Sequence, residues 1–151
     1  GIDRVERVPV RAARQVRAGY DPDAAPAGTD ALPAGQLLTG DQNLVNVQLV
    51  IDYSVGESDD DLDNYVLHRD RAEAALARAA EALAAEWAAG RTIDQVLLTG
   101  SAALPAWVMD RLAARVADQK LGVRVLRASA GALAPPDEVR PAFDAVNQAQ
   151  T

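Results

Sequence analysis

The sequence contains no cysteine, one histidine and only 4% aromatic residues. Without cysteine the chain cannot form disulfides, use a thiol nucleophile or build a cysteine-ligated zinc site. The absence does not indicate the compartment, because reducing and oxidising compartments both contain proteins without cysteine. It also has no run of about 18 apolar residues, so we expect no bilayer-spanning segment within it. Functions that depend on thiols or on a membrane helix inside this stretch are therefore excluded.

Positive charge is scarce as well. The formal net charge is −7 and the sequence pI is about 4.6, a balance that opposes phosphate binding and makes nucleic acid an unexpected partner. The glycines at 19, 28, 35 and 40 have neither the spacing of a phosphate-binding loop nor a following lysine, so no cofactor site is predicted. The 49% hydrophobic content is enough for one domain of 151 residues to close a core.

A long stretch of strict alternation predicts the central strand. Alternate residues on one side are apolar, whereas Gln48 and Asp52 fall on the other side and are expected to face outward. Thr39 to Asn43 is typical of a turn, so Gln36 to Leu38 should fold back on the strand as a hairpin. The residues expected on the core face are Val45, Val47, Leu49, Ile51, Tyr53 and Val55.

The chain before the hairpin predicts two short strands within Gly1 to Gly19 and a surface loop from Gly19 to Gly35. After it, apolar residues at helical spacing run from Leu62 to Trp87. The acidic Asp59 to Asp61 favours a helix start there, and Gly90 is placed to end the helix with a left-handed cap.

Two further helices and a strand are expected. Thr92 and Gln95 form a capping-box pattern that begins a short helix, which Thr99-Gly100 should stop. Ser101 would cap the next helix, with Pro105 in its first turn and Gly122 at its end. Its apolar stripe is Val108, Leu112 and Val116.

The last strand is expected at Val123 to Ala128, with Val123, Val125 and Arg127 on one face, paired with the central strand. Pro135-Pro136 ends it, and a helix should begin at Asp137. The domain division is therefore 1–134 for the folded domain and 135–151 for an exit helix. The start at Gly1 and the helical end suggest a piece of a longer protein.

Three patterns in the sequence are candidates for chemical sites. His68, with Asp63 and Asp70 nearby, is the one candidate for metal or acid–base chemistry, but a single imidazole favours a solvated helix surface. Aspartates 59, 61, 63 and 70 fit part of a calcium-loop spacing, yet Asn64 stands where glycine is required. Ser101 has no G-x-S-x-G context and serves better as a cap. We assign no catalytic, cofactor or metal residues.

Two surfaces are candidates for binding. The acidic run Asp59 to Asp63 could dock a basic partner, although a solvated face is the more common explanation of such a run. The alanine-rich stretch Ala72 to Ala89 has apolar residues outside one stripe, including Ala77, Ala82 and Ala85, which a neighbouring subunit or the core itself could cover.

The stretch LLTGDQNLVNVQLVIDYSV resembles the central strand of the SPFH superfamily (stomatin, prohibitin, flotillin and HflK/HflC, also called band 7), and it looks most like the HflK branch. The segments TIDQVLLTG at 92–100 and PPDEVRPAFDAVNQAQ at 135–150 match in the expected order, and the spacer GYDPDAAPAGTDALPAG is of the kind that HflK-like members carry. The resemblance covers nearly the whole chain.

This resemblance implies an α+β SPFH domain with an antiparallel-rich sheet, packed helices and an exit helix leading to a coiled coil. It implies a non-enzymatic scaffold that self-associates, with a membrane helix just upstream, on the periplasmic face of a bacterial inner membrane. The implied partners are further copies, an HflC-like paralogue and a membrane-bound ATP-dependent protease. The alternatives are a lipid- or small-ligand-binding module on the sheet face and a hydrolase using Ser101 or a metal at His68.

Overall fold

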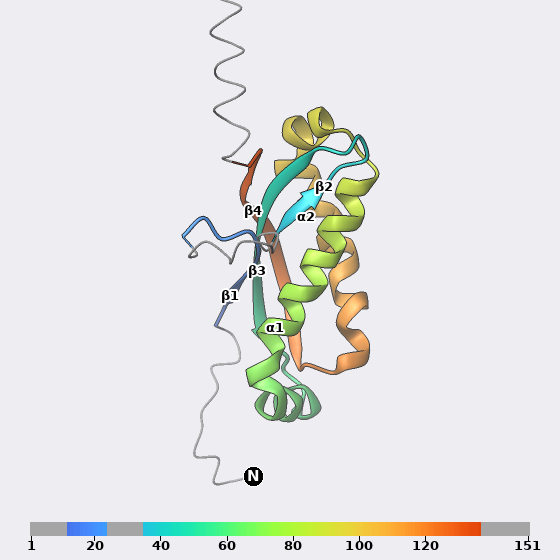
Figure 1. The fold of residues 1–151 in the computed structure, drawn as a ribbon. Helices are drawn as coiled ribbons and strands as arrows, with labels where there is room; N and C mark the ends of the chain where they lie inside the picture. The colour runs from blue at the N-terminus through green and yellow to red at the C-terminus, as the bar shows by residue number, and fades with distance from the viewer. Residues whose placement is uncertain (1–11, 24–34, 137–151) are drawn as a thin grey trace, which may run out of the picture.

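The computed structural model describes residues 12–23 and 35–136. Their fold is α+β, as predicted: an antiparallel four-stranded sheet has two long helices on one of its sides (Figure 1). We call the opposite side the outer face of the sheet. The elements are β1 (Arg14–Gly19), β2 (Gln36–Leu38), β3 (Leu44–Val55), α1 (Asp59–Ala89), α2 (Ile93–Val116), the short 3-10 helix η1 (Ala117–Gln119) and β4 (Val123–Ala134).

Strand β3 is the centre of the sheet, as its alternation predicts. It pairs with β4 along one edge and with β1 and β2 along the other. All six residues expected on the core face are buried against the helices, with relative exposures of 3% or less. Burial of this continuous, largely apolar stripe between the sheet and both helices is the main favourable contribution to the fold.

Gln48 faces outward as predicted, but it is not exposed to solvent. It is only 8% exposed, and Asn46 is only 6% exposed. The side-chain amide of Gln48 lies against Gly131 of β4, and Asn46 accepts a 3.3 Å hydrogen bond from the Nε2 of Gln36. Alternation predicts the side of the sheet correctly, but it does not show that a polar side chain is packed onto a neighbouring strand.

The hairpin between β2 and β3 is confirmed. Thr39 closes its turn, since its backbone N–H donates to the carbonyl of Asn43 at 2.9 Å. Gln42 is the residue with positive φ, at 65°. Gly40 is required for a different reason, because the turn lies close to the end of α1: a Cβ there would be 2.7 Å from the carbonyl oxygen of Ala89. The turn is therefore packed onto the junction between the two helices.

Helix α1 begins as its acidic start predicts. Ser58 is the N-cap, its Oγ accepting from the backbone N–H of Asp61 at 3.0 Å, and three aspartates occupy the first turn, where the helix dipole favours negative charge. The predicted left-handed cap is wrong, because Gly90 has φ −94°. The backbone N–H of Gly90 closes the helix by donating to the carbonyls of the last turn.

Helix α2 corrects the prediction of two helices separated at Thr99-Gly100. The capping box of Thr92 and Gln95 is confirmed, but the helix then continues to Val116. Gly100 is buried within it because a Cβ there would lie 2.7 Å from Cδ1 of Leu133 and 3.3 Å from the Trp87 ring. Glycine lets α2 approach β4 and α1 closely and does not stop the helix.

Ser101 and Pro105 are also inside α2, so neither the predicted cap nor the predicted first-turn position holds. A proline at this depth removes the hydrogen bond to the carbonyl of Ser101. Ser101 is exposed, which leaves that carbonyl next to solvent, while Pro105 itself is buried. The predicted stripe of Val108, Leu112 and Val116 is buried and confirmed.

Strand β4 pairs with β3 as predicted but runs on to Ala134, with register shifts at Asp52/Tyr53 and Gln48/Leu49. The first shift skips Leu126, so that Val125 faces Tyr53 while Arg127 faces Asp52. Because a bulge moves the following residues to the other face, Arg127 does not share a face with Val123 and Val125, contrary to the prediction.

Helix α2 ends earlier than predicted. Val116 is followed by η1, and Lys120 adopts the left-handed conformation with φ 48°. Gly122, at φ 75°, belongs to the approach to β4. The strand predicted near residues 1–11, the loop at 24–34, and the exit helix with its coiled coil at 137–151 lie outside the described residues, so they and the domain division at 134 stay predictions.

Candidate functional site

The described fold does not bring the candidate chemical residues into a catalytic arrangement. Ser101 is exposed on α2, and no described side chain hydrogen-bonds to its hydroxyl. His68 lies within α1, and its side chain is outside the described residues. Aspartates 59, 61 and 63 occupy regular helical turns instead of a loop. Within 12–23 and 35–136, no three His, Asp or Glu side chains are grouped as metal ligands would be.

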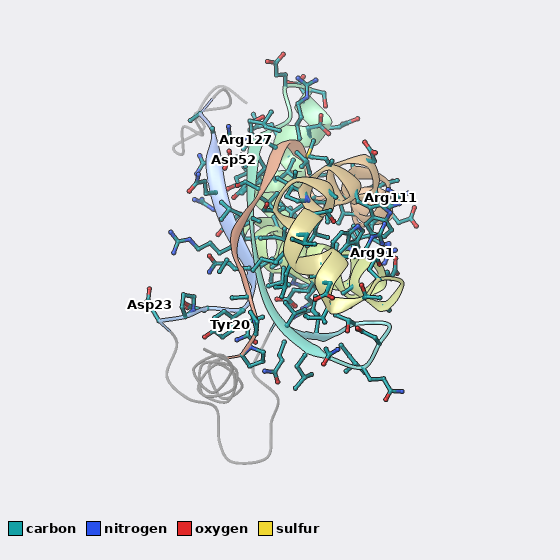
Figure 2. The ribbon with its side chains drawn as sticks, turned by 90° about the horizontal axis from the view of Figure 1, so that it is seen from above. Tyr20, Asp23, Asp52, Arg91, Arg111 and Arg127 are labelled. Carbon is teal, nitrogen blue, oxygen red and sulfur yellow. The ribbon has the colours of Figure 1, made fainter. Side chains whose placement is uncertain are left out.

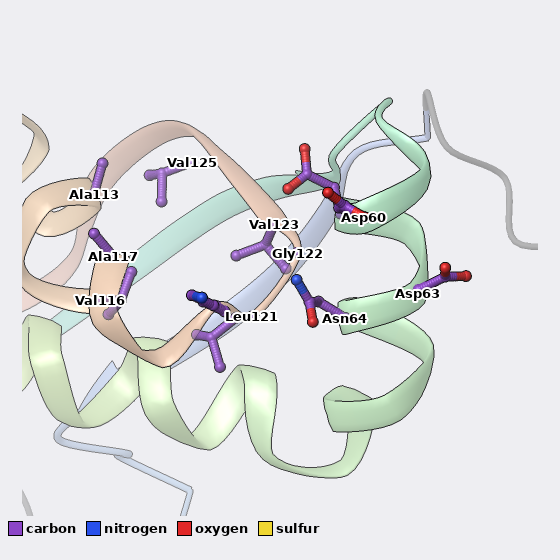
Figure 3. A pocket seen from close by; sticks show the side chains of 12 residues that line it. Asp60, Asp63, Asn64, Ala113, Val116, Ala117, Leu121, Gly122, Val123 and Val125 are labelled. Atoms are coloured by element: carbon purple, nitrogen blue, oxygen red, sulfur yellow. The ribbon is translucent and has the colours of Figure 1, made fainter.

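The acidic run forms one wall of a groove of about 600 Å³, which we call the acidic groove (Figure 3). Asp60, Asp63 and Asn64 come from the first turns of α1, and the opposite wall comes from the end of α2 and the start of β4. Its remaining lining residues are Asp61, Ala113, Val116, Ala117, Lys120, Leu121, Gly122, Val123 and Val125.

Glycine brings these walls together. Gly122 has positive φ, and a Cβ there would lie 2.0 Å from the carbonyl oxygen of Asp61 and 2.6 Å from the backbone nitrogen of Tyr65. The backbone N–H of Gly56 also donates to the carbonyl of Gly122 at 2.8 Å. The start of α1 is thereby fixed against the chain that enters β4, which holds the aspartates in place at the surface.

A second groove, of about 650 Å³, has the opposite charge, and we call it the basic groove. Arg71 and Arg78 line it from α1, and Arg115 and Gln119 line it from the end of α2 and η1. Its floor is made of small side chains, namely Ala74, Ala75, Ala79 and Ala82. Of the alanines predicted outside the main stripe, Ala82 and Ala85 are exposed and Ala82 lines this groove, whereas Ala77 is half-buried against the core.

A third, smaller cavity of about 190 Å³ lies between β1, β2, β3 and α1. Glu81 is its charged residue, and one of its carboxylate oxygens accepts a 2.9 Å hydrogen bond from the backbone N–H of Gly19. That bond joins α1 to the end of β1. The role it indicates is structural.

Among the described residues, two titrating groups have clearly shifted pKa values, and both serve the fold. Burial, together with hydrogen bonding to Tyr65 and Glu73, raises the pKa of Tyr53, whose hydroxyl donates to Glu73 at 2.9 Å. Hydrogen bonds, led by that from the Thr39 hydroxyl, lower the pKa of Asp41. These two residues lie at the core and at the hairpin turn.

The outer face of the sheet carries a different set of charges. Asp52 and Arg127 form an ion pair of 3.2 Å there, and Figure 2 shows them on the sheet, away from Arg111 on α2 and from Arg91 in the connection between the helices. Arg17 of β1 and Arg124 of β4 are exposed; the register places them opposite Val50 and Ser54, the outward positions of β3. This face is therefore polar, with an excess of arginine.

The arginines of this face and of the basic groove were not singled out from the sequence. They are spread between residues 17 and 127 of the sequence. They become neighbours only through the pairing of the strands and the packing of α1 on α2. The spacing of Arg71 and Arg78, seven residues apart on a helix, was the one usable signal.

In the comparison with known proteins, one family model matches the full length of the chain. The model of the SPFH domain / Band 7 family matches residues 1–151. No curated protein matches the chain. Among the described residues, none of the helices has the length and apolar character needed to cross a membrane.

Proposed function

Because the chain belongs to the SPFH domain / Band 7 family, we propose that it is a non-enzymatic scaffold domain that works at a membrane and assembles side by side with further copies. The observation that carries this proposal is the family match over all 151 residues. The geometry is compatible with it, since the described part presents open grooves of opposite charge, which suit contact with another macromolecule.

Within the family, we propose the HflK-like branch. The support is the stretch LLTGDQNLVNVQLVIDYSV, which supplies the hairpin and the central strand around which the core is built. The role that follows is control of access to a membrane-bound ATP-dependent protease, in complex with an HflC-like paralogue. The domain would then sit on the periplasmic face of a bacterial inner membrane.

The scaffold proposal is tested on the longer protein with its upstream segment, solubilised from membranes. We expect large assemblies by light scattering and by electron microscopy. A species that stays monomeric at every concentration would defeat the proposal. Co-purification with a membrane-bound ATP-dependent protease tests the finer assignment, and its absence from assemblies that do form would remove only the HflK-like role.

The arginines on the outer face of the sheet favour a second candidate, a lipid-binding module. Arg17, Arg124 and Arg127 could together attract an anionic bilayer surface, although Asp52 compensates Arg127. Flotation of the chain with anionic vesicles, set against neutral ones, tests this. Lipid binding predicts flotation with anionic vesicles alone, and its loss in an Arg17→Glu, Arg124→Glu variant.

A further inference from the structure

Helix α1 carries opposite charges at two places along its exposed surface. At its start Asp59 and Asp60 are exposed, as is Glu57 just before the N-cap, and none of them pairs with a cation within the described chain. Further on, Arg71 and Arg78 are exposed and make no ion pair with any described carboxylate. The two arginines lie two turns apart, about 10 Å along the helix axis. Both sets of charges are therefore available for contacts outside the chain.

The basic groove is shaped to receive a protein segment. Its alanine floor lets another backbone approach closely, and it extends from Arg71 to Ala82, about 16 Å along the helix. Arg115 on its far wall is already held by Glu86, at 3.0 Å. Arg71 and Arg78 make no ion pair within the described residues, and theirs are the charges that a partner would meet.

We propose that the basic groove of one copy binds the acidic start of α1, residues 57–63, from a second copy. This inference rests on the proposed scaffold function and names a surface for its assembly. The chain has a net charge of −7, so most surfaces of two copies repel each other, and the basic groove is an exception. The helical part of the acidic start, residues 59–63, spans about one and a half turns, a length that the groove accommodates.

One copy can use both surfaces at once. Ala113, Val116 and Ala117 line the acidic groove, whereas Arg115 and Gln119 line the basic one, so the two grooves open on different sides of the end of α2. A contact between two different surfaces is heterologous, and repetition of it generates a ring or an open filament. The proposed contact therefore leads to side-by-side assembly and does not stop at a dimer.

Pairing of free sheet edges is the main competing route between copies. Within the described chain, β4 and β1 form opposite edges of the sheet. Arg17 is exposed on one edge and Arg124 and Arg127 on the other, so joining the edges would bring like charges together. Charged side chains on edge strands act against such pairing. The basic groove and the acidic start of α1 carry opposite charges, so their contact is more favourable than pairing of the sheet edges.

The experiment fixes the chain through an N-terminal hexahistidine tag to neutral phosphatidylcholine vesicles containing nickel-chelating lipid. This raises the local concentration as an anchor would. Because the chain has no cysteine, one cysteine added after Thr151 carries a donor or an acceptor dye, and energy transfer is measured against surface density. We expect transfer above that of randomly placed dyes, weakening as salt is raised.

Two charge reversals test the contact. Arg71→Glu with Arg78→Glu alters the groove, and Asp59→Lys with Asp60→Lys alters the acidic start; each alone should lower self-association at least tenfold. A 1:1 mixture of the two variants should regain it, since every contact between them is again complementary. Asp59→Asn with Asp60→Asn, which disturbs the helix start less, should give a smaller loss in the same direction.

The matched control is Arg17→Glu with Arg124→Glu, which makes the same change in net charge on the outer face of the sheet. It should keep most of the self-association. The proposal is overturned if the unmodified chain shows no excess transfer, if this control loses as much as the groove variant, or if the mixture fails to recover. If the longer protein still forms large assemblies with the groove reversed, the scaffold function stands and the groove contact falls.

Discussion

Asp41, in the turn between β2 and β3, accepts a 3.0 Å hydrogen bond from the backbone N–H of Ile93, the first residue of α2. The two residues are 52 positions apart, and the same carboxylate also accepts from the Thr39 hydroxyl. The backbone N–H of Gly40 adds a 2.8 Å bond to the carbonyl of Arg91. The hairpin turn thus fixes where α2 begins relative to the sheet.

Asp41→Ala should lower the melting temperature at pH 7 by removing the acceptor for Thr39 and Ile93. The pKa of Asp41 is lowered in the fold from its usual value of 3.8, so its contribution is present above pH 3.8 and is lost as the pH falls through the folded value. The difference between the two proteins, measured by circular dichroism from pH 7 to pH 2, should therefore shrink in acid. Asp110→Ala, on the exposed side of α2, is the control and should change little.

Gly100→Val tests whether this glycine serves close packing. We expect a loss of about 1–3 kcal/mol in unfolding free energy, because the added atoms meet Leu133 and Trp87. Ala103→Val, on the exposed side of the same helix, carries only the helix-propensity cost of about 0.5 kcal/mol. Urea denaturation of both variants measures the difference. Equal losses would mean that the contact with Leu133 is unimportant.

The elements that the sequence predicts well are those whose signal is local. Alternation from Val45 to Val55 and the capping box of Thr92 and Gln95 each depend on neighbouring residues alone, and both are confirmed. The prediction that Gly100 stops the helix is wrong because this glycine is required by the close approach of Leu133, which lies on a distant strand. A glycine required for close approach and a glycine that stops a helix look the same in one sequence.

The bulges of β4 could not be predicted for the same reason. Skipping Leu126 is a property of the pairing with β3, and it alone explains why Arg127 meets Asp52. The two charged grooves also depend on tertiary packing, since residues of α1 become neighbours of Arg115 or Val123 only once α2 and β4 are in place. The acidic run was visible in the sequence, but its basic counterpart was not.

The two faces of β3 can be separated by aspartate substitutions. Val47→Asp places an unpaired carboxylate in the core, where Val47 is 3% exposed, and should cost about 3 kcal/mol or more. Gln48→Asp should cost less, about 1–2 kcal/mol, because its site is buried but polar. Arg17→Asp, exposed on the outer face, should cost less than about 0.5 kcal/mol. Chemical denaturation that ranks Gln48→Asp with Arg17→Asp would show that Gln48 is solvated after all.

Tyr53→Phe removes the donor to Glu73 and should cost about 1.5 kcal/mol at pH 7. The pKa of Tyr53 is raised in the fold, so its contribution is fully present below its usual value of 10.0 and is lost as the pH rises toward the folded value. Above pH 10 the unmodified chain should therefore lose the contribution of the Tyr53 hydroxyl to its unfolding free energy, a loss that the variant cannot show. Thermal unfolding from pH 7 to pH 11 measures this; a gap that stays constant would contradict it.

Gly122→Ala tests how the acidic start of α1 is held. Gly122 has φ 75°, and an added Cβ would lie 2.0 Å from the carbonyl oxygen of Asp61, which cannot move without displacing the helix. We expect a loss of about 3 kcal/mol, from backbone strain and from the clash together. Gly90→Ala is the matched control: Gly90 has φ −94°, and its nearest contact would be 3.9 Å away. It should be neutral or slightly stabilising. If the two variants melt alike, Gly122 does not fix the walls of the acidic groove, and the position of the carboxylates must be set by Ser58 and the helix cap alone.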